Sequence, residues 1–145
     1  MPTFDHAWLC EQIVQGAPDA IIFADRDGLI GLWNSGAEEM FGYTSEEALG
    51  KTLDIIIPER LRERHWIGYQ QVMATGVTSY GDKLLAVPAL KSDGTTISIE
   101  FSILLVRSKT GELLGSAALI RDVTDRWQKE KALKQKLAAL ESKAV

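Results

Sequence analysis

Residues Thr96 to Val106 read TISIEFSILLV, and this stretch decides the fold class of the chain. Ile97, Ile99, Phe101 and Ile103 are apolar, and each is separated from the next by a single polar residue. Alternation with a period of two predicts a β-strand with one buried face and one face in contact with water. The stretch therefore predicts a strand in a sheet that is covered on one side.

Strands are also predicted on both sides of this stretch. Lys83 to Leu90 precedes it and Leu113 to Val123 follows it. The intervening segments Ser92-Asp93-Gly94 and Ser108-Lys109-Thr110-Gly111 are rich in turn-forming residues, which is typical of connections between antiparallel neighbours. Earlier in the chain, Ala20 to Ala24 and Leu29 to Trp33 flank a turn and predict a hairpin.

Helices are predicted before, between and after the strands. Apolar residues near one stripe predict an amphipathic helix over Met1 to Gly16. Capping residues and glycines predict two short helices, and Pro58 introduces a longer one; these three helices span Gly36 to Phe41, Thr44 to Leu49, and Glu59 to Thr75. The order of elements predicts an α+β fold with helices on one face of a sheet.

The composition changes at Asp125 to Lys, Gln, Glu, Ala and Leu. In this segment Leu133, Leu137, Leu140 and Ala144 recur with heptad-like spacing. The pattern favours a dimerising coiled-coil connector, and a solvated surface helix is the alternative. We therefore expect an N-terminal amphipathic helix over 1–19, a central domain over 20–124 and a helical connector over 125–145.

The composition excludes several classes of protein. The chain has 145 residues, of which 46% are hydrophobic and 25% charged, and this balance argues against disorder. A net charge of -4 disfavours a nucleic-acid partner, and the single cysteine, Cys10, excludes an internal disulfide or a Cys-rich zinc site. We find no apolar run long enough for a membrane span and no signal segment, so we expect a soluble cytoplasmic domain with no membrane partner.

No enzyme motif is present in the sequence. We find no Gly-x-Ser-x-Gly elbow, no phosphate-binding Gly-Lys-Ser/Thr loop and no His-Glu-x-x-His zinc helix. The two histidines, His6 and His65, leave little material for acid–base catalysis. We expect a protein that is not an enzyme.

A series of short motifs runs through the chain from about Ile13 to Arg126. In chain order these motifs are Gly16-Ala17-Pro18-Asp19-Ala20-Ile21, Trp33-Asn34, Phe41-Gly42-Tyr43, Ile57-Pro58-Glu59-Arg60, Ala74-Thr75-Gly76, Lys91-Ser92-Asp93-Gly94-Thr95 and Ile120-Arg121-Asp122-Val123-Thr124-Asp125-Arg126. Their order and spacing resemble those of the PAS family of sensor domains. The resemblance implies a five-stranded antiparallel sheet whose covering helices leave a mostly apolar cavity. It also implies that Asp122-Val123-Thr124 passes a signal from the sheet to the C-terminal helix.

The most informative single residue is His65. On a helix that begins at Pro58, His65 shares a stripe with Leu61, Tyr69 and Val72, which we expect to face the sheet. A neutral imidazole in an apolar face has one donor and one acceptor to satisfy, and a metal bond to one nitrogen would solve part of that problem. The alternative is a core histidine that is bonded to a carbonyl group or to water, or that reaches solvent.

The segment from Arg64-His65 to Asp93-Gly94-Thr95 resembles oxygen-sensing haem PAS domains. The resemblance implies a haem b whose iron is bound by His65. We expect the cofactor-binding residues to be His65, Tyr69, Leu61, Val72, Leu84, Leu85, Ile99, Phe101, Ile103 and Leu119. Oxygen-sensing relatives have an arginine near the position of Leu85, so an apolar residue there favours carbon monoxide, nitric oxide or redox sensing.

Other ligands and partners follow from the same comparison of motifs. The segment Ser35 to Gly42 lacks the cysteine that flavin photoreceptors of the family use, so no flavin photoadduct is expected. We expect a homodimer formed through the N-terminal and C-terminal helices. An effector outside this chain, such as a kinase, a cyclase or a transcription regulator, would receive the signal. The alternative function is a dimerisation module that binds a small apolar metabolite or no cofactor.

Overall fold

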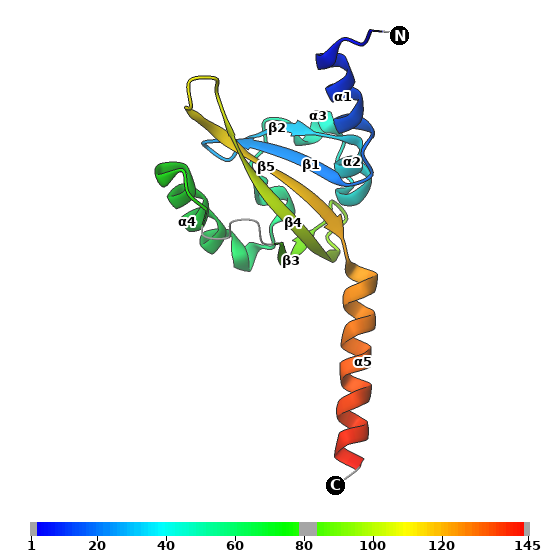
Figure 1. Ribbon diagram of the computed structural model, residues 1–145. Coiled ribbons are helices and arrows are strands. Elements are labelled where there is room, and N and C mark those ends of the chain that lie inside the picture. Colours follow the sequence, from blue (N-terminus) through cyan, green and yellow to red (C-terminus); the bar gives the residue numbers. More distant parts are fainter. Residues whose placement is uncertain (1–2, 79–83, 144–145) are drawn as a thin grey trace.

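The structure is a computed structural model that describes residues 3–78 and 84–143. Its elements in chain order are α1 (His6–Gly16), β1 (Ala20–Asp25), β2 (Ile30–Trp33), α2 (Ser35–Phe41), α3 (Ser45–Ala48), the 3-10 helix η1 (Leu53–Ile56), α4 (Glu59–Thr75), β3 (Leu85–Leu90), β4 (Thr96–Arg107), β5 (Leu113–Asp122) and α5 (Thr124–Lys143). The strands form one antiparallel sheet in the order β2-β1-β5-β4-β3 (Figure 1). The predicted α+β fold is confirmed.

Two details of the secondary structure differ from the prediction. Helix α1 begins at His6 because the carboxylate of Asp5 accepts a hydrogen bond from the backbone N–H of Ala7. The turn η1 was not predicted, and it forms because the Thr52 hydroxyl accepts a hydrogen bond from the N–H of Asp54. Lys83, the predicted first residue of β3, lies outside the described residues.

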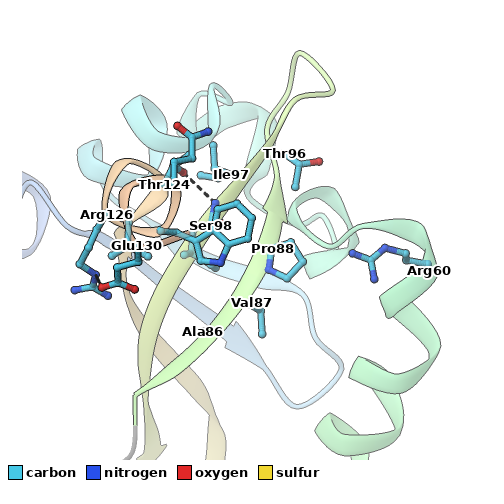
Figure 2. Close-up of a pocket in the computed structure, with 14 residues that line it drawn as sticks. Arg60, Ala86, Val87, Pro88, Thr96, Ile97, Ser98, Thr124, Arg126 and Glu130 are labelled. Atoms are coloured by element: carbon cyan, nitrogen blue, oxygen red, sulfur yellow. Dashed lines mark hydrogen bonds and ion pairs between the residues drawn. The ribbon is translucent and has the colours of Figure 1, made fainter. Parts of the chain in front are cut away.

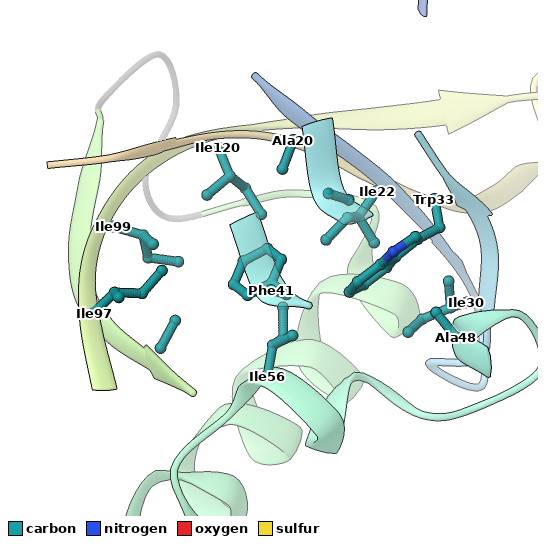
Figure 3. Close-up of a cluster of buried hydrophobic side chains, with 12 residues drawn as sticks. Ala20, Ile22, Ile30, Trp33, Phe41, Ala48, Ile56, Ile97, Ile99 and Ile120 are labelled. Atoms are coloured by element: carbon teal, nitrogen blue, oxygen red, sulfur yellow. The ribbon is translucent and has the colours of Figure 1, made fainter. Parts of the chain in front are cut away.

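The strand register places the apolar residues of β4 on the face that the helices cover. Phe101 lies opposite Leu85 on β3 and Ile120 on β5, and Ile120 lies opposite Ala20 on β1. Residues directly opposite one another in a sheet point to the same face. On this inner face the core gathers around Phe41 of α2 (Figure 3). The buried cluster consists of Ala20, Ile22, Ile30, Trp33, Ala37, Phe41, Ala48, Ile56, Ala89, Ile97, Ile99 and Ile120.

Asn34 connects α1, β1 and α2 at the edge of this core. Its side chain is fully buried, and its Oδ1 accepts hydrogen bonds from the N–H groups of Ile21 and Ala37 at 2.8 and 2.9 Å. Its Nδ2 donates to the carbonyl oxygens of Val14 and Asp19 at 2.8 and 3.0 Å. Asn34 is therefore both the cap of α2 and the anchor for the end of α1.

Helix α5 projects away from the rest of the domain (Figure 1). It has 20 residues, none of which is buried, and its leucines Leu133, Leu137 and Leu140 are exposed. The predicted C-terminal helix is present, and its role as a connector and its pairing as a coiled coil stay predictions. No helix among the residues with described structure is both long enough and apolar enough to cross a bilayer.

Candidate ligand-binding site

Helix α4 carries the candidate ligand His65 and is defined by residues at its two ends. It begins directly after Pro58, where a missing N–H costs little, and Glu59 lies in its first turn. It ends at Gly76, which has a φ of 71° and donates its N–H to the carbonyl oxygen of Val72 at 2.7 Å. Met73 is its one buried residue. Apolar burial therefore contributes little to holding α4 in place.

Hydrogen bonds attach α4 to the neighbouring segments instead. The Trp66 indole N–H donates to the carboxylate of Asp54 at 2.7 Å. The Tyr69 hydroxyl lies 3.1 Å from the carbonyl oxygen of Ala24 and 2.5 Å from that of Asp25, so its proton bonds the end of β1. Each such bond contributes roughly 0.5–1.5 kcal/mol net to the stability of the fold, and more where a charged group takes part.

The stripe of α4 that makes these bonds is rotated from the predicted one. Arg62 donates from Nε to the carbonyl oxygen of Ile57 at 2.9 Å. Arg26 donates to the carbonyl oxygen of Met73 at 3.1 Å. The packed stripe runs through Arg62, Trp66, Tyr69 and Met73. His65 lies beside this stripe, whereas Gly68 is exposed.

Gly28 allows Trp66 to approach the turn between β1 and β2. Its φ is 80°, and a Cβ atom at this position would lie 2.2 Å from the Trp66 ring. Any side chain at Gly28 would displace the indole and its bond to Asp54. The turn and the helix are therefore packed against each other through a glycine.

The His65 ring is half-buried between two aromatic neighbours. Its centroid lies 4.7 Å from that of Trp66, edge to face, and 5.8 Å from that of Tyr69. Its Nδ1 is buried and has no hydrogen-bond partner among the described residues. Loss of solvent lowers the pKa of His65, although the carboxylate of Asp54 acts in the opposite direction. The imidazole is therefore mostly neutral at pH 7, and its buried Nδ1 lacks a hydrogen-bond partner among the described residues.

We expect the lowered pKa of His65 to make the folded state sensitive to acid. The pKa of the histidine is about 6.5 in the unfolded state and lower in the folded state. Between these two pKa values the unfolded state binds more protons than the folded state. The contribution of His65 to the free energy of unfolding is therefore fully present above the pKa of the unfolded histidine. It is lost as the pH falls from that pKa towards the lower pKa of the folded state. Urea unfolding at pH 7.5 and 5.5 (about one unit on either side of the unfolded pKa) should show a larger loss for the wild type than for His65→Gln.

The exposed His6 provides the control for this measurement, because it lies on α1 away from the core. His6→Gln should lose stability on acidification as the wild type does. An equal acid-induced loss in His65→Gln and the wild type would contradict the prediction.

The predicted ligand-contacting residues that are half-buried or buried lie on α4 and on the inner face of the sheet. Leu61, Tyr69 and Val72 are half-buried on α4 with His65. Of the strand residues, Leu85, Ile99, Phe101 and Ile103 lie on the inner face of the sheet. Ile99 belongs to the buried core, whereas Leu85, Phe101 and Ile103 are half-buried. These three offer an apolar surface on the face that carries the core.

The predictions for two of the cofactor-binding residues, Leu119 and Leu84, were wrong. Leu119 lies opposite Ser102 and Ile21, one position from Ile120, so its side chain points to the outer face of the sheet and is 42% exposed. Leu84 precedes β3 and is 63% exposed. Neither can line a chamber with His65. The error arose because β5 has apolar residues on both faces, so its pattern does not reveal which face is inner.

Two cavities lie at the base of α5. One, of about 470 Å³, is bounded by Arg60, Pro88, Ser98, Thr124, Trp127 and Glu130, among others (Figure 2). A second, of about 630 Å³, lies along Asp122 to Leu133. Of the predicted ligand-contacting residues, only Ile99 lines either cavity.

The joint between the sheet and α5 is built by Thr124. Its Oγ1 donates to the carboxylate of Asp122 at 2.5 Å and accepts from the N–H of Ser98 at 3.0 Å. The N–H of Val123 donates to the carbonyl oxygen of Ser98 at 2.8 Å. Val123 and Thr124, the residue before α5 and its first residue, thus both bond to Ser98 of β4.

An ion pair adds a second connection at the same place. Arg126 on α5 lies 3.1 Å from Glu100 on β4, and the glutamate side chain is largely covered. Arg126 also lines the cavity in Figure 2, where it is labelled. A shift of β4 would therefore be transmitted to the first turn of α5.

The profile of the family described as PAS fold matches residues 9–123 of this sequence. The chain belongs to the PAS family. A solved PAS domain from Colwellia psychrerythraea has a TM-score of 0.72 at 22% identity, with 83% of this chain and 99% of that chain covered. This similarity agrees with the sheet and helices described above.

Two curated proteins are similar to this PAS domain in sequence. An uncharacterized protein of Azorhizobium caulinodans is 34% identical over 118 residues, which are 81% of this chain and 16% of that protein. The sensor protein FixL of Bradyrhizobium diazoefficiens is 30% identical over 123 residues, which are 85% of this chain and 24% of FixL. The PAS domain thus spans less than a quarter of the length of these relatives.

Some important residues of the PAS domain were not predicted from the sequence. The bonds of Asn34 to residues 13–20 positions away were not foreseen. The pair Asp54 and Trp66 was also missed. A signal was available for Trp66, because a tryptophan on an amphipathic helix needs a partner for its indole N–H.

Proposed function

We propose that this PAS domain is a sensory input module that binds haem b through His65 and relays its state through α5. The observation that carries the proposal is the buried Nδ1 of His65, which has no partner among the described residues. A half-buried imidazole with a lowered pKa is neutral, and the neutral form is the one that binds metal ions. The donor therefore fits a haem iron.

Apolar side chains on α4 and on the inner face of the sheet support an apolar macrocycle as the ligand. Leu61 and Val72 are half-buried on α4 with His65, and Phe101, Ile103 and Leu85 offer half-buried apolar surface on the sheet. When bound, haem supplies an iron centre that can take a diatomic gas or change its redox state. Because Leu85 has no hydrogen-bond donor in its side chain, it favours carbon monoxide or nitric oxide over oxygen.

The relay uses β5, which leads to α5 along the chain, and β4, which is bonded to the start of α5. Phe101 and Glu100 are neighbours on β4, and Glu100 pairs with Arg126 of α5. A displacement of Phe101 by the ligand would therefore reach α5 through Glu100 and the Thr124 joint. We propose that α1 and α5 mediate a homodimer, and that an effector outside this chain, a kinase, a cyclase or a transcription regulator, reads the position of α5.

Titration of the full chain with haemin tests the proposal by absorption spectroscopy. We expect a protein-bound haem band for the wild type, a shift of that band when the reduced protein takes up carbon monoxide, and loss of the bound-haem spectrum in His65→Ala. Imidazole added to His65→Ala should restore the ligand field, because the missing group is supplied from solution. The matched control is His6→Ala, which removes the other histidine and should bind haem as the wild type does.

Two results would contradict the haem proposal. One is a wild type that binds no haem, and the other is an unchanged haem spectrum in His65→Ala. In the first case the alternative, a dimerisation module with a small apolar metabolite or no cofactor, is favoured. The exposed apolar residues of α1 and α5 support that alternative, because isolated apolar stripes of this kind mark interaction surfaces.

A further inference from the structure

The cavity of about 470 Å³ at the base of α5 is separate from the residues proposed to hold haem, of which only Ile99 borders it. Four elements meet there, since Arg60 comes from α4, Pro88 from β3, Ser98 from β4 and Trp127 from α5 (Figure 2). We call it the α5-base cavity. Its volume lies within the range of about 300–1,000 Å³ that is typical of small-molecule sites.

Arg60 is the cation of the α5-base cavity that lacks a partner. Its side chain makes no ion pair or hydrogen bond with another described residue, and it is exposed. The other charged residues that line the cavity, Arg126 and Glu130, lie 3.9 Å apart, and Arg126 also lies 3.1 Å from Glu100. An anion in the cavity would therefore find its counter-charge at Arg60, whose guanidinium is shaped to bind a carboxylate.

The edge strand β3 adds a backbone donor to the same cavity. The Ser98 N–H donates to Thr124 and the Ser98 carbonyl oxygen accepts from Val123, so both groups point away from β3. Ser98 lies opposite Pro88, so this pair shares no ladder bond, and every second residue of β3 directs its backbone groups away from β4. Ala86, two residues before Pro88, lines the cavity and therefore presents its N–H at the open edge of the sheet.

Pro88 favours a small molecule over a peptide strand as the occupant of this edge. Proline has no backbone N–H, so the row of outward donors on β3 is interrupted two residues after Ala86. A strand added to β3 would lose a ladder bond at Pro88, and proline is typical of edges that do not accept another strand. A compact ligand needs only the single donor at Ala86.

The remainder of the cavity wall is largely apolar and includes an indole ring. Val87 and Pro88 of β3 and Ile97 of β4 contribute aliphatic surface. Trp127 of α5 is 48% exposed, and the ammonium group of Lys131 lies over its ring, 4.9 Å from the centre. A partly exposed indole that lines a cavity gives a planar ring a stacking or edge-to-face partner. The apolar part of the ligand is therefore expected to be flat.

We propose that the α5-base cavity binds a small aromatic carboxylate. The carboxylate accepts hydrogen bonds from the Arg60 guanidinium and the Ala86 N–H, and the ring lies against Pro88 and Trp127. A molecule held in this way connects α4 and β3 to the first turns of α5, next to the joint that Thr124 forms with β4. The cavity is therefore a second input to α5, one that acts without a ligand at the proposed haem site.

Titration of the full chain with naphthoate, in the absence of haem, tests the site by NMR spectroscopy. We expect saturable changes in the chemical shifts of the Trp127 indole N–H, assigned with Trp127→Phe, and of the Ala86 backbone N–H. Naphthamide has the same ring without the charge, so it should bind about tenfold more weakly. Hydrogen exchange of the backbone N–H groups at the start of α5 should slow when naphthoate is bound, because the ligand holds α5 to β3.

Substitution of Arg60 tests the role of the charge. Arg60→Gln should weaken the binding of naphthoate about tenfold and leave the binding of naphthamide unchanged, because only the ion pair is lost. Arg64→Gln is the matched control, since Arg64 is also exposed on α4 but does not line the cavity. His65→Ala should bind naphthoate as the wild type does, which separates this site from the one proposed for haem.

Three results would overturn the inference. The first is the absence of a saturable change at Trp127 and at Ala86. The second is an equal affinity of the wild type for naphthoate and naphthamide, or an equal affinity of Arg60→Gln and the wild type for naphthoate. The third is a set of chemical-shift changes confined to Val72 and Phe101, which would place the probe against the residues proposed to hold haem.

Discussion

Asn34→Ala should lower the free energy of unfolding by about 3 kcal/mol, because it removes the cap of α2 and leaves buried backbone groups without partners. The N–H groups of Ile21 and Ala37 lose their acceptor, and the carbonyl oxygens of Val14 and Asp19 lose their donor. The side chain is fully buried, so the loss of these bonds is more costly than at an exposed site. Urea denaturation followed by tryptophan fluorescence measures the change.

The neighbouring Ser35 provides the control for Asn34. Its hydroxyl donates to the carbonyl oxygen of Gln15, also at the end of α1, but the side chain is exposed and water can replace it. Ser35→Ala should therefore cost less than about 1 kcal/mol. If both variants were equally stable, the buried network at Asn34 would not be the anchor described above.

Gly115→Ala should destabilise the domain by about 3 kcal/mol. A Cβ atom at this position would lie 2.1 Å from the carbonyl oxygen of Ala24 and 2.8 Å from the Phe23 ring. The first obstacle is backbone in the adjacent strand, so β1 and β5 must separate or the new methyl group must be strained. The unfolding midpoint in urea should fall, and chemical shifts along β1 should change with it.

Gly68→Ala is the matched substitution in open space. Nothing lies within 4 Å of a Cβ atom at Gly68, which is an interior residue of α4. Alanine favours the helix by about 0.5–1 kcal/mol relative to glycine, so this variant should be more stable than the wild type. A stability loss in Gly68→Ala as large as that in Gly115→Ala would mean that steric contact is not the cause.

Local patterns in the sequence predicted the strands and helices well. The alternation from Ile97 to Ile103 determines a strand and its buried face, because a period of two is set by backbone geometry. The caps at Asn34 and Thr44 and the left-handed glycine at Gly76 end or begin helices through neighbouring atoms. Such features depend on a few adjacent residues, and a single sequence contains them.

The candidate site was predicted less completely because its geometry depends on distant segments. The rotation of α4 follows from hydrogen bonds of Trp66 and Tyr69 to Asp54 and β1, and no spacing within the helix reveals those partners. The face of Leu119 depends on the register between β5 and its neighbours. The motif resemblance placed the chain in its family, whereas the distribution of side chains around His65 required the three-dimensional structure.

The Thr124 joint acts on a long rigid arm. Twenty residues of α-helix extend about 30 Å from the pivot. A tilt of about 10° at the base would carry the far tip sideways by roughly 5 Å, close to one helical pitch. Sub-ångström adjustments among Ser98, Asp122 and Thr124 are thus amplified along the helix. A partner bound to the distal end of α5 would be displaced far enough to change the register of its contacts with the helix.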